Sequence, residues 1–447
     1  MSWDDTKIVM RDARRRHWAG VACGLCAGVW LGAAEAPIKL VNTGLSPYSI
    51  SLCMVAGVFT ARWTLPTLFK GTRQIAADLL CNKHLIVWAL LAGMLWAVAN
   101  TLTVFAIRDV GLTIAFPLWN TNSLVGLIWG RLLFGELKGA SRKNIARVVL
   151  GSLAIVTAAT LLGFSTMHTS VGHSHRGVQG IIAALCASLL WGTMYIPYRK
   201  AYISGMNPLS FVTAFTFGEL GAVLTLVLVF DGGTHAQIFH DAGLVHVLFW
   251  LFLGGFIWVI GDIFQQFAAK YLGIGRGIPL SNTNQIWGLV WGAMVFGELR
   301  DADTSQRLMV ALGSLTMIAG AVAISSAVAT QREHISMNDA LQRECARYDL
   351  DIARVLRDYG ASEFDRNGAA RAWWDWLIVL VAVAAFVALG SQARVPALAM
   401  DFHWMAVLLF VMVAALIGCA FVLRKLAKPT VTTSCSTSYI QRTDSHP

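Results

Sequence analysis

Residues 117–137 read PLWNTNSLVGLIWGRLLFGEL, and residues 279–299 read PLSNTNQIWGLVWGAMVFGEL. The two stretches belong to a longer repeat, because residues 88–137 match residues 250–299 without a gap at 20 of 50 positions. Self-similarity at a fixed offset indicates two copies of one structural unit. We therefore expect a fold made of two similar halves.

The apolar runs around this repeat have the length of membrane-spanning helices. Of 447 residues, 56% are apolar and 13% are charged, against about a quarter charged in soluble domains. A helix of about 20 apolar residues crosses the roughly 30 Å hydrocarbon core of a bilayer. We expect spanning helices over residues 18–38, 48–68, 84–106, 112–134, 145–164, 178–198, 208–230, 246–268, 275–296, 306–328, 373–390 and 404–423.

Each copy has five expected helices, an odd number, so the second copy enters the membrane from the opposite side. The loop after the second expected helix carries Lys70, Arg73 and Lys83, whereas the equivalent loop after the seventh carries no Lys or Arg. Because Lys and Arg concentrate in cytoplasmic loops, this bias predicts an inverted pair. The same rule predicts a multi-pass protein of the cell membrane with both termini cytoplasmic.

The predicted fold class is an all-α polytopic membrane protein, a ten-helix bundle of two inverted five-helix repeats followed by a C-terminal two-helix hairpin. Between the bundle and the hairpin, Leu341, Cys345, Tyr348 and Ile352 recur at helical spacing among charged residues, which is typical of an amphipathic helix. The expected units are residues 16–164 for the first repeat, 176–328 for the second, 330–371 for a cytoplasmic amphipathic segment, 373–425 for the extra transmembrane hairpin and 426–447 for a disordered tail.

Composition and motifs exclude several function classes. The net charge of +10 is spread over short loops between apolar runs, so we expect membrane lipid and no nucleic acid as a partner. The sequence has no P-loop and no nucleophile motif, so we expect neither an enzyme nor a cofactor. His168, His173 and His175 crowd one loop, where we expect a solvated segment and no metal site.

Polar residues inside the expected spans are candidates for a substrate site. Such residues are costly in lipid unless they face a cavity or a partner, and inverted repeats place substrate sites near the midplane. Asn amides both donate and accept hydrogen bonds, as recognition of hydroxyl groups requires, and Trp rings can stack on a sugar. The alternative is that these groups only hold the helices together. The candidates are Asn120, Asn122, Asn282, Asn284, Gln285, Trp119, Trp96, Trp258, Asn100 and Gln265.

Four ionisable residues also lie within expected spans: Glu35, Arg62, Glu219 and Asp262. Asp262 stands where the first copy has Asn100. A carboxylate that binds a proton on one side of the membrane and releases it on the other would couple transport to a proton gradient. We expect this role for Asp262 or Glu35, although Lys39 lies one turn from Glu35 and could pair with it.

The two-copy repeat and the Asn-rich runs closing in Phe-Gly-Glu resemble the sugar-uptake (glucose/ribose porter) family of the drug/metabolite transporter superfamily. The resemblance covers residues 16–328 and implies ten helices and proton-coupled uptake of a monosaccharide. The extension over residues 330–447 and the exchange of Asn100 for Asp262 depart from that pattern.

The first hypothesis is a secondary active transporter that takes up a sugar-like substrate with protons by alternating access. The alternatives are an exporter or exchanger of the same superfamily and a non-transporting membrane scaffold or sensor. A homodimer is left open.

Overall fold

A computed structural model describes residues 3–34, 36–37, 45–110, 115, 118–165, 174–232, 245–297, 299–300, 302–352, 355, 371–394 and 400–426. This part of the chain is all helical. The helices are α1 (Trp3–Ala33), α3 (Pro47–Phe69), α4 (Thr72–Cys81), α5 (Lys83–Val110), α7 (Asn122–Leu133), α8 (Arg142–Ser165), α9 (Ser174–Ile203), α10 (Pro208–Phe230), α12 (Val245–Leu272), α13 (Ile274–Ser281), α14 (Asn284–Val290), the π-helix η3 (Trp291–Val295), α15 (Thr304–Ser325), α16 (Gln331–Arg347), α18 (Trp373–Gln392) and α19 (Phe402–Leu426).

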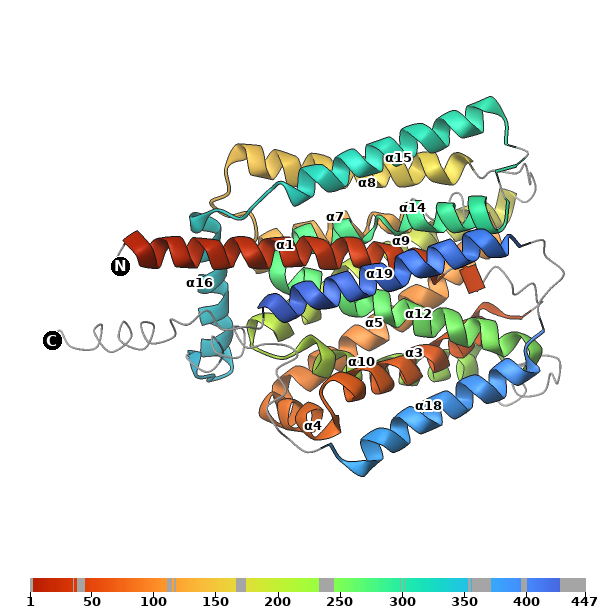
Figure 1. Cartoon of the computed structure of the whole chain (residues 1–447), viewed down its shortest axis with the longest axis horizontal. Helices are drawn as coiled ribbons and strands as arrows, with labels where there is room; N and C mark the ends of the chain where they lie inside the picture. Colours follow the sequence, from red (N-terminus) through yellow and green to blue (C-terminus); the bar gives the residue numbers. More distant parts are fainter. Residues whose placement is uncertain are drawn as a thin grey trace.

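The long helices run side by side, as Figure 1 shows, and the described residues include nine that are long and apolar enough to cross a membrane. Three further spans were expected. One is α1, whose first residues are largely polar. Its apolar portion begins at Trp18 and ends with the helix at Ala33, which leaves it short. The other two, over residues 112–134 and 275–296, are interrupted and therefore fall outside the nine. The chain is an all-α, multi-pass membrane protein.

Equivalent residues start equivalent helices in the two halves. Pro47 is the first residue of α3 and Pro208 the first residue of α10, where the missing proline N–H costs no hydrogen bond. Ser46 caps α3 by accepting from Ser49 N at 3.1 Å, and Asn207 caps α10 by accepting from Leu209 N at 2.9 Å. The repeat seen in the sequence is thus matched in local structure.

The two halves pack mainly on each other. Helix α1 packs on α12 and α14, while its counterpart α9 packs on α5 and α7. Likewise α3 packs on α12, α10 packs on α5, and α8 packs on α15. The first and second helices of each half therefore lie against the third helix of the other half, and most of the interior is an interface between the copies.

Glycines allow the closest of these crossings. A Cβ added at Gly57 would lie 2.0 Å from Phe252 O, and one added at the equivalent Gly218 would lie 2.0 Å from Leu90 O. Such contacts are possible only without a side chain, and small residues at helix interfaces are typical of membrane proteins.

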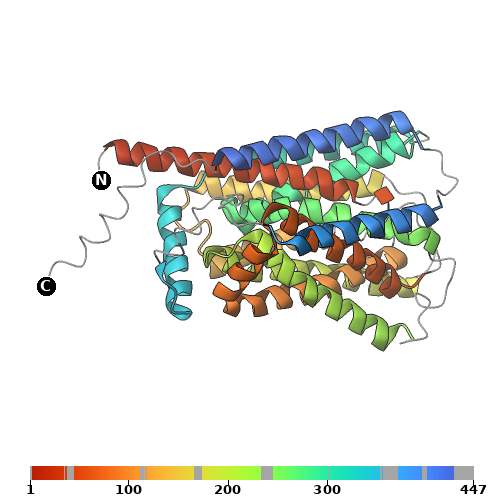
Figure 2. The ribbon, with the colours of Figure 1, turned by 60° about the horizontal axis from the view of Figure 1, so that its bottom comes forward.

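The C-terminal hairpin lies on the outside of the bundle, where Figure 2 shows α18 and α19 in blue. Helix α18 covers α3 and α12, and the Phe386 ring lies 5.0 Å from Phe252 and 4.8 Å from Phe256. Helix α19 packs on α1, with the Cys23 and Cys419 sulfurs 3.5 Å apart.

Outside the spanning helices, α4 occupies a segment expected to be a loop. Helix α16 lies in the segment where an amphipathic helix was expected, and it crosses one end of the bundle (Figure 1). We call this end, which also holds the turns around residues 70, 138 and 270, the α16 end. Most of the residues of the expected tail, 427–447, lie outside the described part of the chain.

We expect Gly218→Ala to destabilise the protein by about 1–3 kcal/mol, because the new methyl group would meet the Leu90 carbonyl oxygen. Thermal unfolding in detergent measures the effect. The control is Gly221→Ala in the same helix, where an added Cβ has no atom within 4 Å and helix propensity alone favours alanine. Equal stabilities of the two variants would show that the crossing is looser than described.

Candidate functional site

Two of the expected continuous spans are broken at equivalent positions, which corrects the sequence prediction. Helix α13 ends at Ser281 and α14 begins at Asn284, and a turn at Thr121 precedes α7. At each break the backbone makes an i to i+3 bond, Thr121 N to Leu118 O and Thr283 N to Leu280 O, both at 3.3 Å. Broken helices of this kind are tolerated in membranes where they are buried or line a cavity.

Threonine hydroxyls stabilise both breaks in the same way. Thr121 Oγ1 donates to Leu118 O at 2.6 Å and Thr283 Oγ1 donates to Leu280 O at 2.8 Å. The side chain thereby supplies the carbonyl with a second partner where the regular helical pattern stops. The shared Asn-Thr-Asn sequence thus accounts for two matching turns in the two halves.

Three of the predicted asparagines meet at these breaks. Asn282 Nδ2 donates to Asn122 Oδ1 at 3.3 Å and to Asn120 O at 3.5 Å. All three residues are buried, and Asn120 and Asn282 are equivalent residues of the two copies. A contact between equivalent residues lies at the pseudo-twofold centre of the bundle, where inverted-repeat carriers have their sites.

The next two candidates have polar atoms without a partner. Asn284 Oδ1 and Gln285 Nε2 are buried and have no hydrogen-bond partner among the described residues. Buried polar atoms are nearly always paired, so this acceptor and donor on adjacent residues are groups that a polar ligand or a water could satisfy.

Gln265 and Asn100 have different surroundings. Gln265 Nε2 donates to Ser281 Oγ at 2.5 Å, which places this amide against the end of α13. Asn100 Nδ2 donates instead to Ser51 Oγ of α3 at 3.0 Å. Gln265 therefore contacts the broken helix, whereas Asn100 is held by a neighbouring span.

The predicted tryptophans form two ring contacts. Trp96 and Trp258, which are equivalent residues, have ring centroids 4.9 Å apart at 56°. Trp119 contacts Trp191 edge-on, with centroids 6.2 Å apart. Trp96 is 1% exposed, so a sugar could stack on it only after the two halves move apart.

Asp262 belongs to a buried group of three ionisable side chains. Arg62 Nη2 bonds to Asp262 Oδ2 at 2.7 Å, and Arg62 Nη1 bonds to Glu219 Oε2 at 2.8 Å. All three side chains are 0% exposed. They come from α3, α12 and α10, so the cation joins helices of both halves.

Polar and aromatic neighbours surround this group. Gln266 Nε2 donates to Asp262 Oδ1 at 2.9 Å, and the Tyr202 hydroxyl donates to Gln266 Oε1. The Arg62 guanidinium lies 4.1 Å from the centroid of the Phe215 ring and 5.5 Å from that of Trp258. Aromatic faces favour a cation at these distances, and the predicted Trp258 thus links the charged group to the tryptophan pair.

The charges of this group do not balance. One guanidinium and two carboxylates leave a formal charge of −1, and a single proton would make the group neutral. Isolated charge in a low-dielectric interior is strongly unfavourable. One proton bound to either carboxylate would therefore remove the net formal charge of this buried group.

The equivalent positions in the other half carry no charge. The offset of 161 that relates Pro47 to Pro208 relates Arg62 to Val223 and Glu219 to Val58. Asp262 corresponds to Asn100 at the offset of 162. The other half thus builds the same helices with uncharged residues, and Val58 and Val223 are buried there.

The second proton candidate, Glu35, lies outside the described residues, as do His168 and His173. Within the described part of the chain, no group of three or more His, Cys, Asp or Glu side chains could hold a metal ion.

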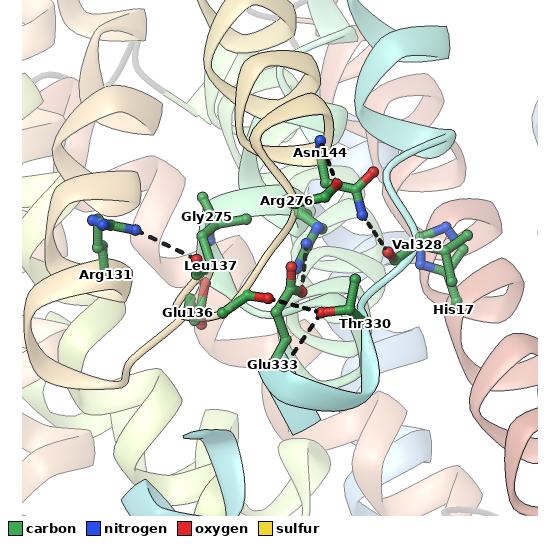
Figure 3. Close-up of polar contacts among 12 residues, drawn as sticks. His17, Arg131, Glu136, Leu137, Asn144, Gly275, Arg276, Val328, Thr330 and Glu333 are labelled. Atoms are coloured by element: carbon green, nitrogen blue, oxygen red, sulfur yellow. Dashed lines mark hydrogen bonds and ion pairs between the residues drawn. The ribbon is translucent and has the colours of Figure 1, made fainter. Parts of the chain in front are cut away.

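Glu136, at the end of the first Phe-Gly-Glu run, caps the helix that leads to the second break. Its Oε1 accepts from Ile274 N at 3.0 Å and its Oε2 from Gly275 N at 2.8 Å. Figure 3 shows Glu136 beside Gly275 and Arg276. A carboxylate at a helix N-terminus binds the free N–H groups and the positive end of the helix dipole. Arg199 Nε lies 3.2 Å from the same carboxylate, so this contact ties the two halves at the α16 end.

The fold is that of an all-α, multi-pass membrane protein with buried polar groups between its helices. Residues 67–165 match the family described as "Sugar transport protein". This match confirms the likeness to sugar-uptake proteins that the repeat motifs indicated.

Individual relatives agree. The chain is 24% identical over 243 residues to a proposed sugar uptake protein of Listeria innocua, covering 53% of this chain and 77% of the relative. It is 28% identical over 149 residues to one from Listeria monocytogenes, covering 33% of this chain and 47% of the relative. Transmembrane protein 144 homolog B of Dictyostelium discoideum is 24% identical over 153 residues, covering 33% of this chain and 40% of the relative.

Among solved structures, one titled "Crystal structure of protein" aligns with a TM-score of 0.47 and 14% identity, over 68% of this chain and 95% of that chain. This likeness is too weak to support a statement about fold or function.

We expect Arg62→Met to destabilise the protein by about 3–5 kcal/mol, because it leaves two buried carboxylates without their cation. Thermal unfolding in detergent measures this loss. Adding Glu219→Gln and Asp262→Asn to the same chain should restore most of the stability, since the site is then uncharged. A single variant as stable as the parent would contradict the described ion pairs.

Proposed function

We propose that the protein is a secondary active transporter that takes up a sugar with protons by alternating access. The observation that carries the proposal is the pair of broken helices with buried, unpaired amide atoms at Asn284 and Gln285. The likeness to sugar-uptake proteins supports the substrate class.

The asparagine cluster suits a neutral, hydroxylated substrate. A sugar hydroxyl donates one hydrogen bond and accepts others, and an amide side chain offers both complements. Asn282 Nδ2 donates to Asn122 Oδ1 at 3.3 Å. A sugar hydroxyl could take the place of this hydrogen bond by accepting from Asn282 and donating to Asn122, so that neither amide is left unpaired. We infer that Asn120, Asn122, Asn282, Asn284 and Gln285 bind hydroxyls, with Gln265 and Trp119 beside them.

Proton coupling is assigned to the group of Arg62, Glu219 and Asp262. Its formal charge of −1 becomes zero when one carboxylate binds a proton. A neutral site can pass through the closed conformation at lower electrostatic cost than a charged one. The protein loaded with proton and sugar then changes conformation, so that both are released on the other side. Of the two carboxylates, Asp262 has an additional amide partner in Gln266.

The packing of each half's helices on the other half supports alternating access. The polar residues on the axis are buried, Asn120 at 3% and Asn282 at 6% exposure, so the described conformation is closed around them. Rocking one half against the other would expose the cluster to each side in turn. From the bias of Lys and Arg we infer that the α16 end, with both termini, lies in the cytoplasm.

We expect Asp262→Asn to abolish sugar accumulation driven by a pH gradient while exchange of labelled for unlabelled sugar continues. Because the site is already uncharged in this variant, the conformational change that carries the sugar across no longer needs a proton. Proteoliposomes with an imposed gradient and a panel of monosaccharides provide the measurement. Asp303→Asn, at the exposed cap of α15, serves as the matched control. Full gradient-driven accumulation by Asp262→Asn would refute the proton role of Asp262.

We expect Asn282→Ala to weaken sugar binding about tenfold, the effect of losing roughly one good hydrogen bond, without lowering expression. Binding of the transported sugar to purified protein measures the change. Asn144→Ala removes the same kind of side chain at the start of α8, outside the axis. Unchanged affinity in Asn282→Ala would leave this residue a purely structural role.

A further inference from the structure

Helix α16 lies across the end of the bundle, roughly perpendicular to the spanning helices (Figures 1 and 2). Thr330 caps it by accepting from Glu333 N at 3.4 Å, so the helix begins at Gln331, before Leu341, the first residue of the predicted amphipathic pattern. Two glutamates of α16, Glu333 and Glu344, bind cations that belong to the transporter bundle.

The first attachment is an ion pair at the start of α13. Glu333 Oε2 lies 2.7 Å from Arg276 Nη2, with exposed fractions of 1% and 4%. Arg276 follows Gly275, whose N–H binds Glu136 (Figure 3). Thr330 Oγ1 also donates to Gly139 O at 3.3 Å. The N-terminal end of α16 thus contacts both halves, beside the contact between Glu136 and Arg199 that joins them.

The second attachment lies at the other end of α16. Lys200 Nζ at the end of α9 is 3.0 Å from Glu344 Oε2. Trp88 Nε1 of α5 donates to the Tyr348 hydroxyl at 3.1 Å, and the His84 ring lies 4.3 Å from the Tyr348 ring. Helix α5 belongs to the first half and α9 to the second, so this end also bridges the copies.

The two attachments are far enough apart to span the closed end. Glu333 and Glu344 are 11 residues apart, about 16 Å along a helix. A rigid helix fixed at both points resists separation of α5, α9 and α13. Opening the bundle at this end requires at least one attachment to break.

The attachments are mainly polar, which makes them releasable. The buried apolar residues Leu341, Cys345 and Val355 form a cluster of their own, with Leu350 packed against it. Lys200 and Glu344 are 9% and 14% exposed, so water can replace their contact as they part. An ion pair that water can reach contributes only a modest net free energy, so this contact can orient α16 and still break readily.

We propose that α16 is a latch that holds the α16 end of the transporter closed, and that release of Glu333 and Glu344 from Arg276 and Lys200 permits that end to open. This rests on the proposed alternating-access function. The latch restrains the opening step, so breaking it speeds sugar exchange.

The test compares the full-length protein with Glu333→Gln/Glu344→Gln in proteoliposomes and in detergent. We expect sugar exchange to rise about three- to tenfold, because the latch loses one buried and one partly exposed ion pair. Hydrogen–deuterium exchange at residues 270–281 should rise with it, while exchange at the outer ends of α5 and α10 stays the same. Arg343→Gln is the matched control, because Arg343 is exposed on the same helix.

Charge reversal provides a second, independent variant. Arg276→Glu alone should act like the double glutamine variant, and Arg276→Glu with Glu333→Arg should return exchange and deuterium uptake towards the parent values. Unchanged or slower sugar exchange in the folded double glutamine variant would overturn the latch. If the parent moves no sugar in the panel, the proposed function fails, and the deuterium measurement still decides whether α16 restrains residues 270–281.

Discussion

A charge buried in the interior of a membrane protein must be neutralised where it lies, and Arg62 meets this constraint with two carboxylates instead of one. The arginine connects α3 to α10 and α12 through bonds of 2.8 and 2.7 Å. One carboxylate would balance it. The second leaves a formal charge of −1 in the buried interior, and the proposed transport cycle depends on when a proton removes that charge.

The charged group is an asymmetric addition to a symmetric frame. Equivalent glycines, Gly57 and Gly218, allow equally close crossings in the two halves, and equivalent threonines stabilise the two helix breaks. Val58 and Val223 occupy the positions that correspond to Glu219 and Arg62. The proposed alternating-access cycle would use two conformations related by this symmetry, and the charges would set the direction of coupling.

The sequence predicts helix positions well because the apolar run length is set by the bilayer; α10 spans residues 208–230 as expected. The helix breaks at Thr121 and Thr283 were missed, since a change to i to i+3 bonding leaves the apolar pattern intact. Arg62 and Glu219 were recognised as buried ionisable residues, but they are 157 positions apart, so their pairing depends on tertiary structure. The early start of α16 depends on a Thr330 cap that hydrophobic spacing does not reveal.

The central claim is that one proton crosses with each sugar molecule. The most direct test adds sugar outside lightly buffered proteoliposomes that contain a pH-sensitive dye, at zero initial gradient and with the membrane potential clamped. The account predicts acidification of the interior in step with sugar entry, at a ratio of about one proton per sugar, because the group of Arg62, Glu219 and Asp262 has one unbalanced charge. Sugar entry with no change of internal pH would contradict it.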